Sequence, residues 1–159
     1  MLDEYELAEK FIRQYSIKNL KIADLAAGTG WTCALISKLS EVDLVHAVEI
    51  SQHRIEELFE KTVRILEGNP AKIKRYLGSF YEIKLENSSV DIDVLSQDFH
   101  HSDEPLLLLK KVSRILKKGG SALLIGEHYI DWKKILRRII SILLKERRLS
   151  VNFYDLFPA

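Results

Sequence analysis

The chain has little of several features that would place it in well-defined protein classes. It contains one cysteine, Cys33, among 159 residues, which excludes an internal disulfide framework and is compatible with a reducing cytosol. No apolar run approaches the roughly 20 residues that a membrane span requires. The acidic N-terminus lacks the apolar core of a secretory signal peptide. We therefore expect a cytoplasmic protein without a membrane span.

Patterns typical of nucleic-acid and metal-binding proteins are also missing. The formal net charge is only +1, and no basic groove is interleaved with aromatic residues. No set of His, Cys, Asp and Glu has the spacing of a metal centre. The chain shows no repeat, low-complexity tract or interdomain linker. We therefore expect no nucleic-acid partner and no metal, and a small molecule is the default ligand.

Short apolar runs alternate with segments of helical periodicity. The runs cover residues 22–25, 44–48, 73–77, 92–95 and 122–125, and the helical segments cover 3–15, 32–39, 52–66 and 104–116. Strands that are apolar on both faces are typical of a parallel sheet covered on both sides. This alternation predicts an α/β fold: a Rossmann-like, doubly wound, mostly parallel sheet of five to six strands with helices on both faces. At this length we expect a single domain over residues 1–159, with an entry helix in 1–18 and a cofactor-binding core in 19–127.

The C-terminal part is more basic than the rest. Residues 131–150 carry seven Lys or Arg against two acids, and 131–148 are predicted to form a basic amphipathic helix followed by a tail, 149–159. Such a helix can bind an anionic substrate or a membrane surface. The interpretation that we favour is that its apolar face covers the sheet while its charges are solvated.

The stretch from Lys21 to Trp31 is the most informative part of the sequence. An apolar run ends in Asp24, passes through a turn of small residues and enters a helical segment. A strand that feeds such a turn and then a helix N-terminus lets backbone N–H groups approach a nucleotide-like cofactor. Glu49 closes the next apolar run about 20 residues after Gly30, where an acid can accept hydrogen bonds from ribose hydroxyls.

Asp24 distinguishes between two kinds of cofactor. The spacing Gly28-x-Gly30-x-x-Cys33 nearly satisfies the dinucleotide fingerprint, so an NAD-dependent oxidoreductase is one alternative. A carboxylate at the end of the first strand would repel a pyrophosphate, however, whereas it would attract a cofactor that carries an ammonium and a sulfonium. The charge therefore favours a cationic cofactor.

The segment Asp24-Leu25-Ala26-Ala27-Gly28-Thr29-Gly30 resembles the first motif of class I S-adenosylmethionine-dependent methyltransferases. Residues 78–80, 93–101 and 114–120 resemble later motifs of the small-molecule branch of that family, so the resemblance covers roughly residues 20–127. It implies a methyltransferase that moves a methyl group from S-adenosyl-L-methionine to a small-molecule acceptor by in-line displacement. S-adenosyl-L-homocysteine would be the product.

The resemblance also assigns residues to the cofactor. Gly28 and Gly30 match the last two glycines of the family's turn, while Ala26 replaces the first, and the turn should survive if this position is not left-handed. Ser79 stands where the family usually has Asp, and its hydroxyl can still accept a hydrogen bond from an adenine amino group. The residues expected at the cofactor are Asp24, Ala26, Gly28, Gly30, Glu49, Ile50, Ser79, Phe80, Ser96 and Gln97.

Two adjacent histidines are the candidates for catalysis. His100 and His101 follow the fourth predicted strand, at the edge where open α/β sheets bind ligands. A neutral imidazole there can deprotonate an acceptor. The alternatives are that one imidazole ring only lines the pocket, or that it forms a hydrogen bond at the start of the next helix. Residues 127–129 follow the fifth strand at the same edge and are a second choice for substrate contacts.

The sequence supplies fewer strands than a complete methyltransferase sheet contains. The family has seven strands, the last two forming an antiparallel end, and this chain supplies five or six, so the C-terminal strand hairpin is expected to be absent or truncated. A bare edge strand invites pairing with another chain, so we expect a homodimer through the C-terminal helix and tail. Ala26, Ser79 and the short C-terminus also leave open a non-catalytic, methyltransferase-like binding or partner subunit.

Overall fold

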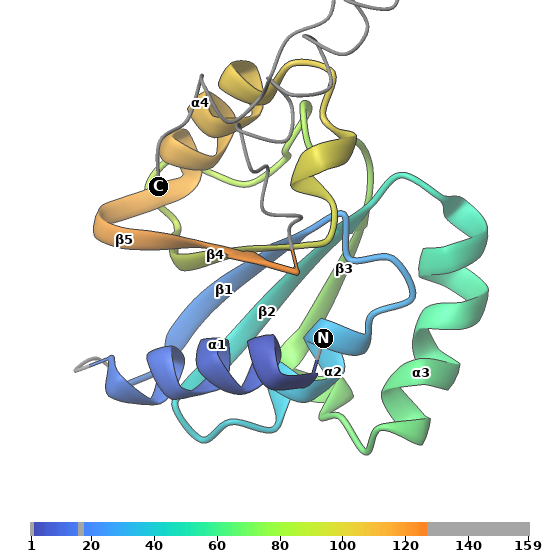
Figure 1. Cartoon of the computed structure of the whole chain (residues 1–159). Coiled ribbons are helices and arrows are strands. Elements are labelled where there is room, and N and C mark those ends of the chain that lie inside the picture. Colours follow the sequence, from blue (N-terminus) through green and yellow to red (C-terminus); the bar gives the residue numbers. More distant parts are fainter. Residues whose placement is uncertain (1, 16–17, 127–159) are drawn as a thin grey trace, which may run out of the picture. The chain divides into compact units, whose positions relative to one another are not determined.

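The computed structural model describes residues 2–15 and 18–126 of the chain (Figure 1). By its internal contacts the chain divides into two compact units, Met1–Glu127 and His128–Ala159, and every described residue belongs to the first unit. The predicted cofactor-binding core therefore falls within this unit. The predicted basic helix 131–148 and tail 149–159 lie outside the described residues.

Helices and strands alternate along the described chain. Their order is α1 Leu2–Gln14, β1 Leu20–Leu25, α2 Trp31–Ser37, β2 Val42–Glu49, the π-helical turn η1 Arg54–Leu58, α3 Phe59–Ile65, the 3-10 turn η2 Pro70–Lys72, β3 Ile73–Leu77, β4 Val90–Ser96, the 3-10 turn η3 Phe99–His101, α4 Pro105–Ile115 and β5 Leu116–Ile125. Each predicted apolar run is part of a strand. None of these helices is long and apolar enough to cross a bilayer.

The five strands form one parallel sheet in the order β3-β2-β1-β4-β5. This confirms the predicted Rossmann-like α/β fold. The chain runs outward from β1 to β3 and then returns to β4, on the other side of β1. Because all strands point the same way, their carboxyl ends share one edge, and the change of direction leaves a crevice between the ends of β1 and β4.

Apolar side chains cover both faces of the sheet. One buried cluster joins the strands to α1, α2 and α3 and includes Ile22 of β1, while a second joins them to α4 and includes Leu25 of β1. Figure 1 shows α1 and α4 on opposite sides of the sheet. Each fully buried Leu or Ile contributes about 1.5–3 kcal/mol. Burial on both faces explains why β1 lacks the alternating pattern of a half-exposed strand.

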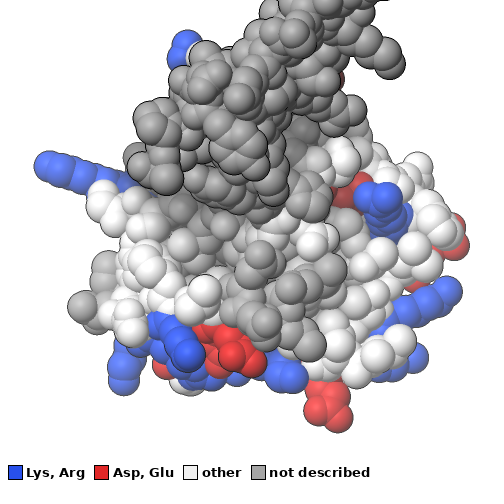
Figure 2. Space-filling model, viewed as in Figure 1, with Lys and Arg blue, Asp and Glu red and all other residues white. Residues whose placement is uncertain are grey.

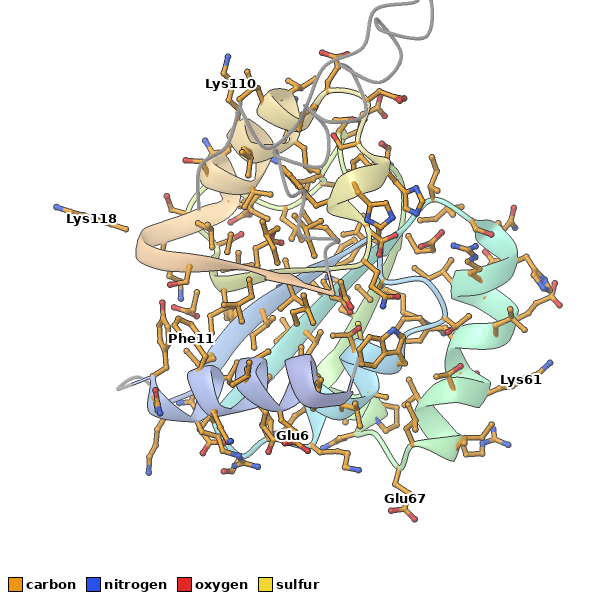
Figure 3. All side chains as sticks on the ribbon, viewed as in Figure 1. Glu6, Phe11, Lys61, Glu67, Lys110 and Lys118 are labelled. Carbon is orange, nitrogen blue, oxygen red and sulfur yellow. The ribbon has the colours of Figure 1, made fainter. Side chains whose placement is uncertain are left out.

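The lysine side chains labelled in Figure 3 lie at the periphery of the described unit. In Figure 3 the side chains of Lys61, Lys110 and Lys118 extend away from the sheet, and all three residues are exposed. Figure 2 shows basic and acidic side chains mixed over the described part of one face. The described surface in this view therefore has no large area of a single sign.

The last strand begins earlier than the sequence predicts. The sequence predicts a helical segment up to residue 116 and a strand only from residue 122, but residues 117–120 already belong to β5, which starts at Leu116. The ammonium of Lys117 lies 2.8 Å from a carboxylate oxygen of Asp91 on β4, which ties this segment to the sheet. Gly119 has a φ of +83°, and the pairing of β4 with β5 shifts register between Val90 and Ile92. The bulge accommodates a polar stretch that an apolar pattern does not reveal.

The helical segment predicted over residues 52–66 is divided in two. It begins with the π-helical turn η1 and continues as α3. The carbonyl of Ile55 accepts a hydrogen bond from Arg75 on β3 at 3.0 Å, so this carbonyl is satisfied by a side chain. Ile55 and Phe59 are both buried, which places two large side chains of this segment in the core.

Asp93, in the middle of β4, is a buried carboxyl group without a partner. Its side chain is fully buried, and neither oxygen has a hydrogen-bond partner among the described residues. Its register neighbours are Ala23 on β1 and Ala122 on β5. Burial raises the pKa of Asp93 well above the usual value, and the nearby charge of Asp24 raises it further. The group is therefore stable in the fold only in its protonated form.

Replacing Asp93 by Asn should change how stability depends on pH. Because the folded protein holds this proton more tightly than the unfolded chain, the wild-type free energy of unfolding falls as pH rises above about 4. The Asp93→Asn variant has no such proton to lose. We expect it to gain about 1–3 kcal/mol over the wild type between pH 5 and pH 8, as measured by urea denaturation. The exposed Asp43→Asn change on β2 is the control, and an equal gain there would contradict the interpretation.

Candidate functional site

A pocket of about 340 Å³ opens at the carboxyl ends of β1 and β4. It is lined by the turn between β1 and α2 with the start of α2, by the end of β4 with the loop and η3 that follow, and by the start of η1. The lining residues are Ala26, Ala27, Gly28, Thr29, Trp31, Thr32, Arg54, Ser96, Gln97, Asp98 and His101. The pocket thus occupies the crevice that the strand order creates, where open α/β sheets bind ligands.

The turn after β1 has three residues in the left-handed region. Ala26, Gly28 and Gly30 have φ values of +58°, +56° and +84°. A Cβ on Gly30 would lie 2.4 Å from a ring carbon of Phe59, whereas a Cβ on Gly28 would meet only the carbonyl oxygen of Ala26, at 4.0 Å. Gly30 is therefore required for space as well as for conformation, and Gly28 for conformation alone.

Ala26 is left-handed, although a left-handed conformation is unfavourable for alanine. The turn was expected to survive if this position is not left-handed, but the position is left-handed and the turn is present. The left-handed conformation costs an L-residue about 1–2 kcal/mol relative to glycine. Neighbouring hydrogen bonds offset this strain: the N–H of Ala27 donates to the carbonyl of Val48 at 2.9 Å, and that of Gly30 donates to Ala27 at 2.8 Å.

Glu49, at the end of β2, binds two loops through its carboxylate. One oxygen accepts the backbone N–H of Gly28 at 2.9 Å, and the other accepts that of Ser51 at 2.8 Å. The side chain is buried behind the turn. A carboxylate has about four acceptor positions, so two remain for further donors. Glu49 therefore fixes the turn and keeps the capacity to accept a ligand hydroxyl.

Asp24, at the end of β1, is also buried behind the turn, with 1% of its surface exposed. One carboxylate oxygen accepts a hydrogen bond from the Cys33 thiol at 2.9 Å, and the other has no partner in the described part of the chain. Burial raises the pKa of Asp24 to about 7, against the effect of the Cys33 hydrogen bond, and the charges of Asp98 and Glu49 add to the rise. A nearby cation would lower this pKa again.

The loop after β4 forms the opposite wall. Ser96 is buried, and its hydroxyl has no partner among the residues described. Gln97 is left-handed, with a φ of +64°, and its backbone N–H donates to the carbonyl of Ile125 at 2.8 Å. Its side chain leaves no room at Gly126, where a Cβ would lie 2.7 Å from Cγ of Gln97. Strained residues of this kind often occur at ligand sites.

The two candidate histidines have different positions. Both belong to η3, and their ring centroids are 4.1 Å apart. His101 lines the pocket, whereas His100 is exposed and is not part of the lining. The structure therefore brings one of the two predicted catalytic residues to the pocket. In the part of the chain that is described, no group of three or more His, Cys, Asp and Glu side chains could hold a metal ion.

The predicted cofactor residues fall into three sets. Those that line the pocket are Ala26, Gly28, Ser96 and Gln97. Asp24 and Glu49 are buried behind the turn, and Gly30 belongs to the turn itself without lining the pocket. Those that do not line this pocket are Ile50, which is 72% exposed, Ser79 and Phe80. The hydroxyl of Ser79 accepts the backbone N–H of Tyr81 at 3.1 Å, which stabilises its own loop.

Three polar residues of the lining were not singled out from the sequence. Asp98 follows Gln97 directly after β4, so a carboxylate in a loop at the ligand-binding edge was a usable signal. Thr32 lies in the first turn of α2 and resembles an ordinary helix residue. Arg54 lies at the start of η1, and nothing in the sequence distinguishes it from a solvated surface cation.

A larger cavity of about 480 Å³ lies elsewhere, between α3 and β3. Its lining contains two acids, Glu60 and Glu67, and two arginines, Arg64 and Arg75. The guanidinium of Arg75 is already engaged by the Ile55 carbonyl and lies 5.9 Å from the centre of the Phe59 ring. No buried unpartnered polar atom belongs to this lining. Size alone therefore does not identify the functional site.

The residues around the smaller pocket fit a cationic cofactor. Asp24 and Ser96 each hold a buried polar atom that no described residue satisfies, and such atoms are costly unless a ligand or water reaches them. Asp98 adds a carboxyl group to the lining and Glu49 another directly behind it. These acids would attract an ammonium and a sulfonium and would repel a pyrophosphate.

Several expectations concern residues that are not described. Residues 127–129, the second choice for substrate contacts, belong to this set. So do the basic helix 131–148 and the tail 149–159, through which a homodimer was expected. They remain predictions.

Comparison with known proteins identifies the core of the chain. Residues 23–124 match the family described as methyltransferase domain. The chain is 26% identical over 121 residues to a demethylmenaquinone methyltransferase of Lactococcus lactis, a match that covers 71% of this chain and 44% of the relative. It is 28% identical over 102 residues to a sarcosine/dimethylglycine N-methyltransferase of Aphanothece halophytica, with 63% and 35% covered. The chain thus spans less than half the length of these two relatives.

Solved structures have the same fold. A putative S-adenosylmethionine-dependent methyltransferase from Methanococcus maripaludis superimposes with a TM-score of 0.67 at 22% identity, covering 91% of this chain and 72% of that chain. A putative sarcosine dimethylglycine methyltransferase from Galdieria sulphuraria superimposes with a TM-score of 0.66 at 24% identity, with 87% and 53% covered.

Replacing Ala26 by Gly should stabilise the protein. Glycine adopts the left-handed conformation without strain. The relief of strain should exceed the entropic cost of a more flexible unfolded chain, so the free energy of unfolding should rise by about 0.5–1 kcal/mol, as measured by urea denaturation. The matched control is Ala27→Gly, next to it in the turn. Ala27 has no positive φ, so that change should destabilise by about 0.5–1 kcal/mol. Equal losses in both variants would show that Ala26 is unstrained.

Proposed function

Because this chain belongs to the methyltransferase domain family, we propose that it binds S-adenosyl-L-methionine at the turn between β1 and α2 and methylates a small molecule. The observation that carries this proposal is the pocket at the ends of β1 and β4. Its wall contains a left-handed, glycine-containing turn, and behind this turn lies a buried carboxyl oxygen of Asp24 that no described residue satisfies. The class of cofactor follows from that combination of a close backbone approach with an unneutralised acid.

The cofactor supplies a methyl group that its sulfonium has already activated. A bond forms between the acceptor atom and the methyl carbon while the carbon–sulfur bond breaks, its electron pair stays on sulfur, and any acceptor proton goes to a base or to water. This chemistry needs little from the protein beyond orientation and exclusion of water. The turn and the loop after β4 would hold the two reactants on either side of the pocket.

The acidic residues have separate roles in this proposal. Asp24 and Asp98 would attract the ammonium of the cofactor, one from behind the turn and one from the lining. Glu49 would accept a ribose hydroxyl with the acceptor positions that Gly28 and Ser51 leave open. The hydroxyl of Ser96 and the amide of Gln97 would contact the amino-acid part. Ile50, Ser79 and Phe80 remain expected near the adenine, outside the described pocket.

His101 is the better candidate for a base because it lines the pocket. A base is needed only when the acceptor carries a proton that must leave early, as a hydroxyl or an acidic carbon does. His100, 4.1 Å away between ring centres, would then orient the ring of His101.

The acceptor is proposed only as a small molecule. The relatives are named for quite different acceptors, demethylmenaquinone in one and sarcosine or dimethylglycine in the other. A shared fold therefore does not select one acceptor. The alternative of an NAD-dependent oxidoreductase is disfavoured by Asp24 behind the turn and by Asp98 in the lining, since both carboxylates would repel a pyrophosphate.

Binding experiments test the cofactor. We expect calorimetric titration to show binding of S-adenosyl-L-methionine and S-adenosyl-L-homocysteine but not of NAD. The Asp24→Asn change should weaken binding by about tenfold or more, because a charged hydrogen-bond acceptor is lost, and the exposed Asp43→Asn change should leave it unaltered. Binding of NAD alone would reject the proposal. Binding of the sulfur cofactors without transfer of a labelled methyl group in an acceptor screen would favour the non-catalytic alternative.

The affinity for the cofactor should also depend on pH. Because the pKa of Asp24 is about 7, the fraction of ionised carboxylate falls about fivefold between pH 7 and pH 6. The dissociation constant of S-adenosyl-L-methionine should rise by about the same factor, within a range where an α-ammonium with a pKa near 8 stays charged. The Asp24→Asn variant should show no such dependence, and an equally steep change in the variant would assign the effect to another group.

A further inference from the structure

The thiol of Cys33 lies in direct contact with the acid that the proposed function places at the cofactor. Its sulfur is 2.9 Å from one carboxylate oxygen of Asp24. Both side chains are buried, and the other Asp24 oxygen has no partner among the described residues. The contact joins α2, which follows the turn, to the end of β1, which precedes it. The thiol therefore engages one oxygen of the carboxyl group and leaves the other without a described partner.

We propose that Cys33 is a positioning residue, whose thiol holds one oxygen of Asp24 and leaves the other for the cationic part of the cofactor. This inference rests on the proposed function and deepens it. With one oxygen held from α2, the carboxyl plane cannot rotate freely. The unpartnered oxygen is then fixed in orientation before the ligand arrives, which reduces the ordering cost of binding.

Other charged groups around Asp24 cannot do this. Asp98 after β4 and Glu49 on β2 act on Asp24 through their charges, and so does Asp24 on Asp93 of β4. Asp98 and Glu49 are acids, so both oppose ionisation of Asp24, whereas Asp93 is protonated in the fold and adds no charge. Cys33 on α2 is the group that donates a hydrogen bond to this carboxyl among the described side chains. Burial raises the pKa of the Cys33 thiol, and Asp24 raises it further, so the thiol remains a protonated donor.

A thiol also suits the position better than a hydroxyl would. Cys33 belongs to the apolar cluster beneath α1, α2 and α3, where a small apolar side chain packs without cost. A thiol is a weak donor, so it orients Asp24 without fully stabilising the charge. The carboxylate thus stays in need of a cation, and ligand binding supplies one.

The test compares Cys33→Ser, Cys33→Ala and Ser37→Ala. The Ser variant retains a side-chain donor, and a stronger one, whereas the Ala variant keeps only the backbone N–H of residue 33, which bonds to Asp24 in every variant. Ser37 is buried on the same helix, and its hydroxyl bonds to Ala34 and Asn69, so Ser37→Ala disturbs α2 without touching Asp24. Circular dichroism and thermal unfolding establish which variants fold.

The first measurement needs no cofactor. The ionisation of Asp24 is followed by carboxyl ¹³C NMR between pH 5 and pH 9, with Asp24→Asn used to assign the signal. We expect the midpoint to be lowest in Cys33→Ser, intermediate in the wild type and highest in Cys33→Ala, and to be unchanged in Ser37→Ala. Equal midpoints in the wild type and both Cys33 variants would overturn the inference.

The second measurement is the affinity for S-adenosyl-L-methionine at pH 7. We expect Cys33→Ala to bind about two- to tenfold more weakly than the wild type, Cys33→Ser to recover the affinity, and Ser37→Ala to match the wild type. If the midpoints follow the expected order but neither the wild type nor any variant binds the cofactor, the proposed function fails, while the effect of the Cys33 hydrogen bond on Asp24 stands. If the wild type binds and the Cys33 variants bind equally well, the positioning role fails and the proposed function stands.

Discussion

The buried carboxylate of Glu49 is the interaction on which the pocket depends. It holds the N–H of Gly28, in the turn after β1, and that of Ser51, in the turn after β2. These two turns belong to adjacent parallel strands, so neither can move along the edge without breaking a charge-assisted hydrogen bond in a buried position. The turn can therefore tolerate an unfavourable backbone conformation at Ala26. The sheet fixes the position of Glu49, and the two hydrogen bonds of Glu49 fix the turns after β1 and β2 relative to the sheet.

Several features that would destabilise a domain lie at this edge or within the sheet, while the left-handed residues Asn19, Glu67 and Ser88 lie elsewhere. Ala26 and Gln97 are left-handed without being glycine, and Asp24 and Asp93 are carboxyl groups within the sheet. Elsewhere the sheet is packed with Leu, Ile and Val on both faces. The apolar core offsets the cost of these groups, each of about 1–3 kcal/mol. Strained residues such as Ala26 and Gln97 beside a pocket are typical of a ligand site.

Much of the fold could be predicted because its signals are local. The apolar runs at Ile22 and Val45 mark strands buried on both faces, and the turn from Asp24 to Gly30 contains its own glycine spacing. The pairing of Lys117 with Asp91 could not be predicted, because it joins residues 26 apart and makes a polar stretch part of β5. A pattern of hydrophobicity carries no information about such a contact.

The candidate site was predictable to a similar degree. Ser96, Gln97 and His101 follow from their place after a strand, since the carboxyl ends of parallel strands meet at one edge. The left-handed conformation of Ala26 could not be deduced, because alanine there contradicts local preference and is held by bonds from Val48 and within the turn. Arg54 lines the pocket because the chain turns after β2 and places the start of η1 beside it. Long-range geometry of this kind has no counterpart in residue spacing.

The contact between Gly30 and Phe59 links the turn to a helix that is distant in sequence. The Phe59 ring occupies the space where a side chain at position 30 would stand, so the first residue of α3 restricts this position of the turn to glycine. Mutational drift in one is therefore restricted by the other. A larger residue at position 30 would be tolerated only together with a smaller one at position 59, and the two sites should vary as a pair among related chains.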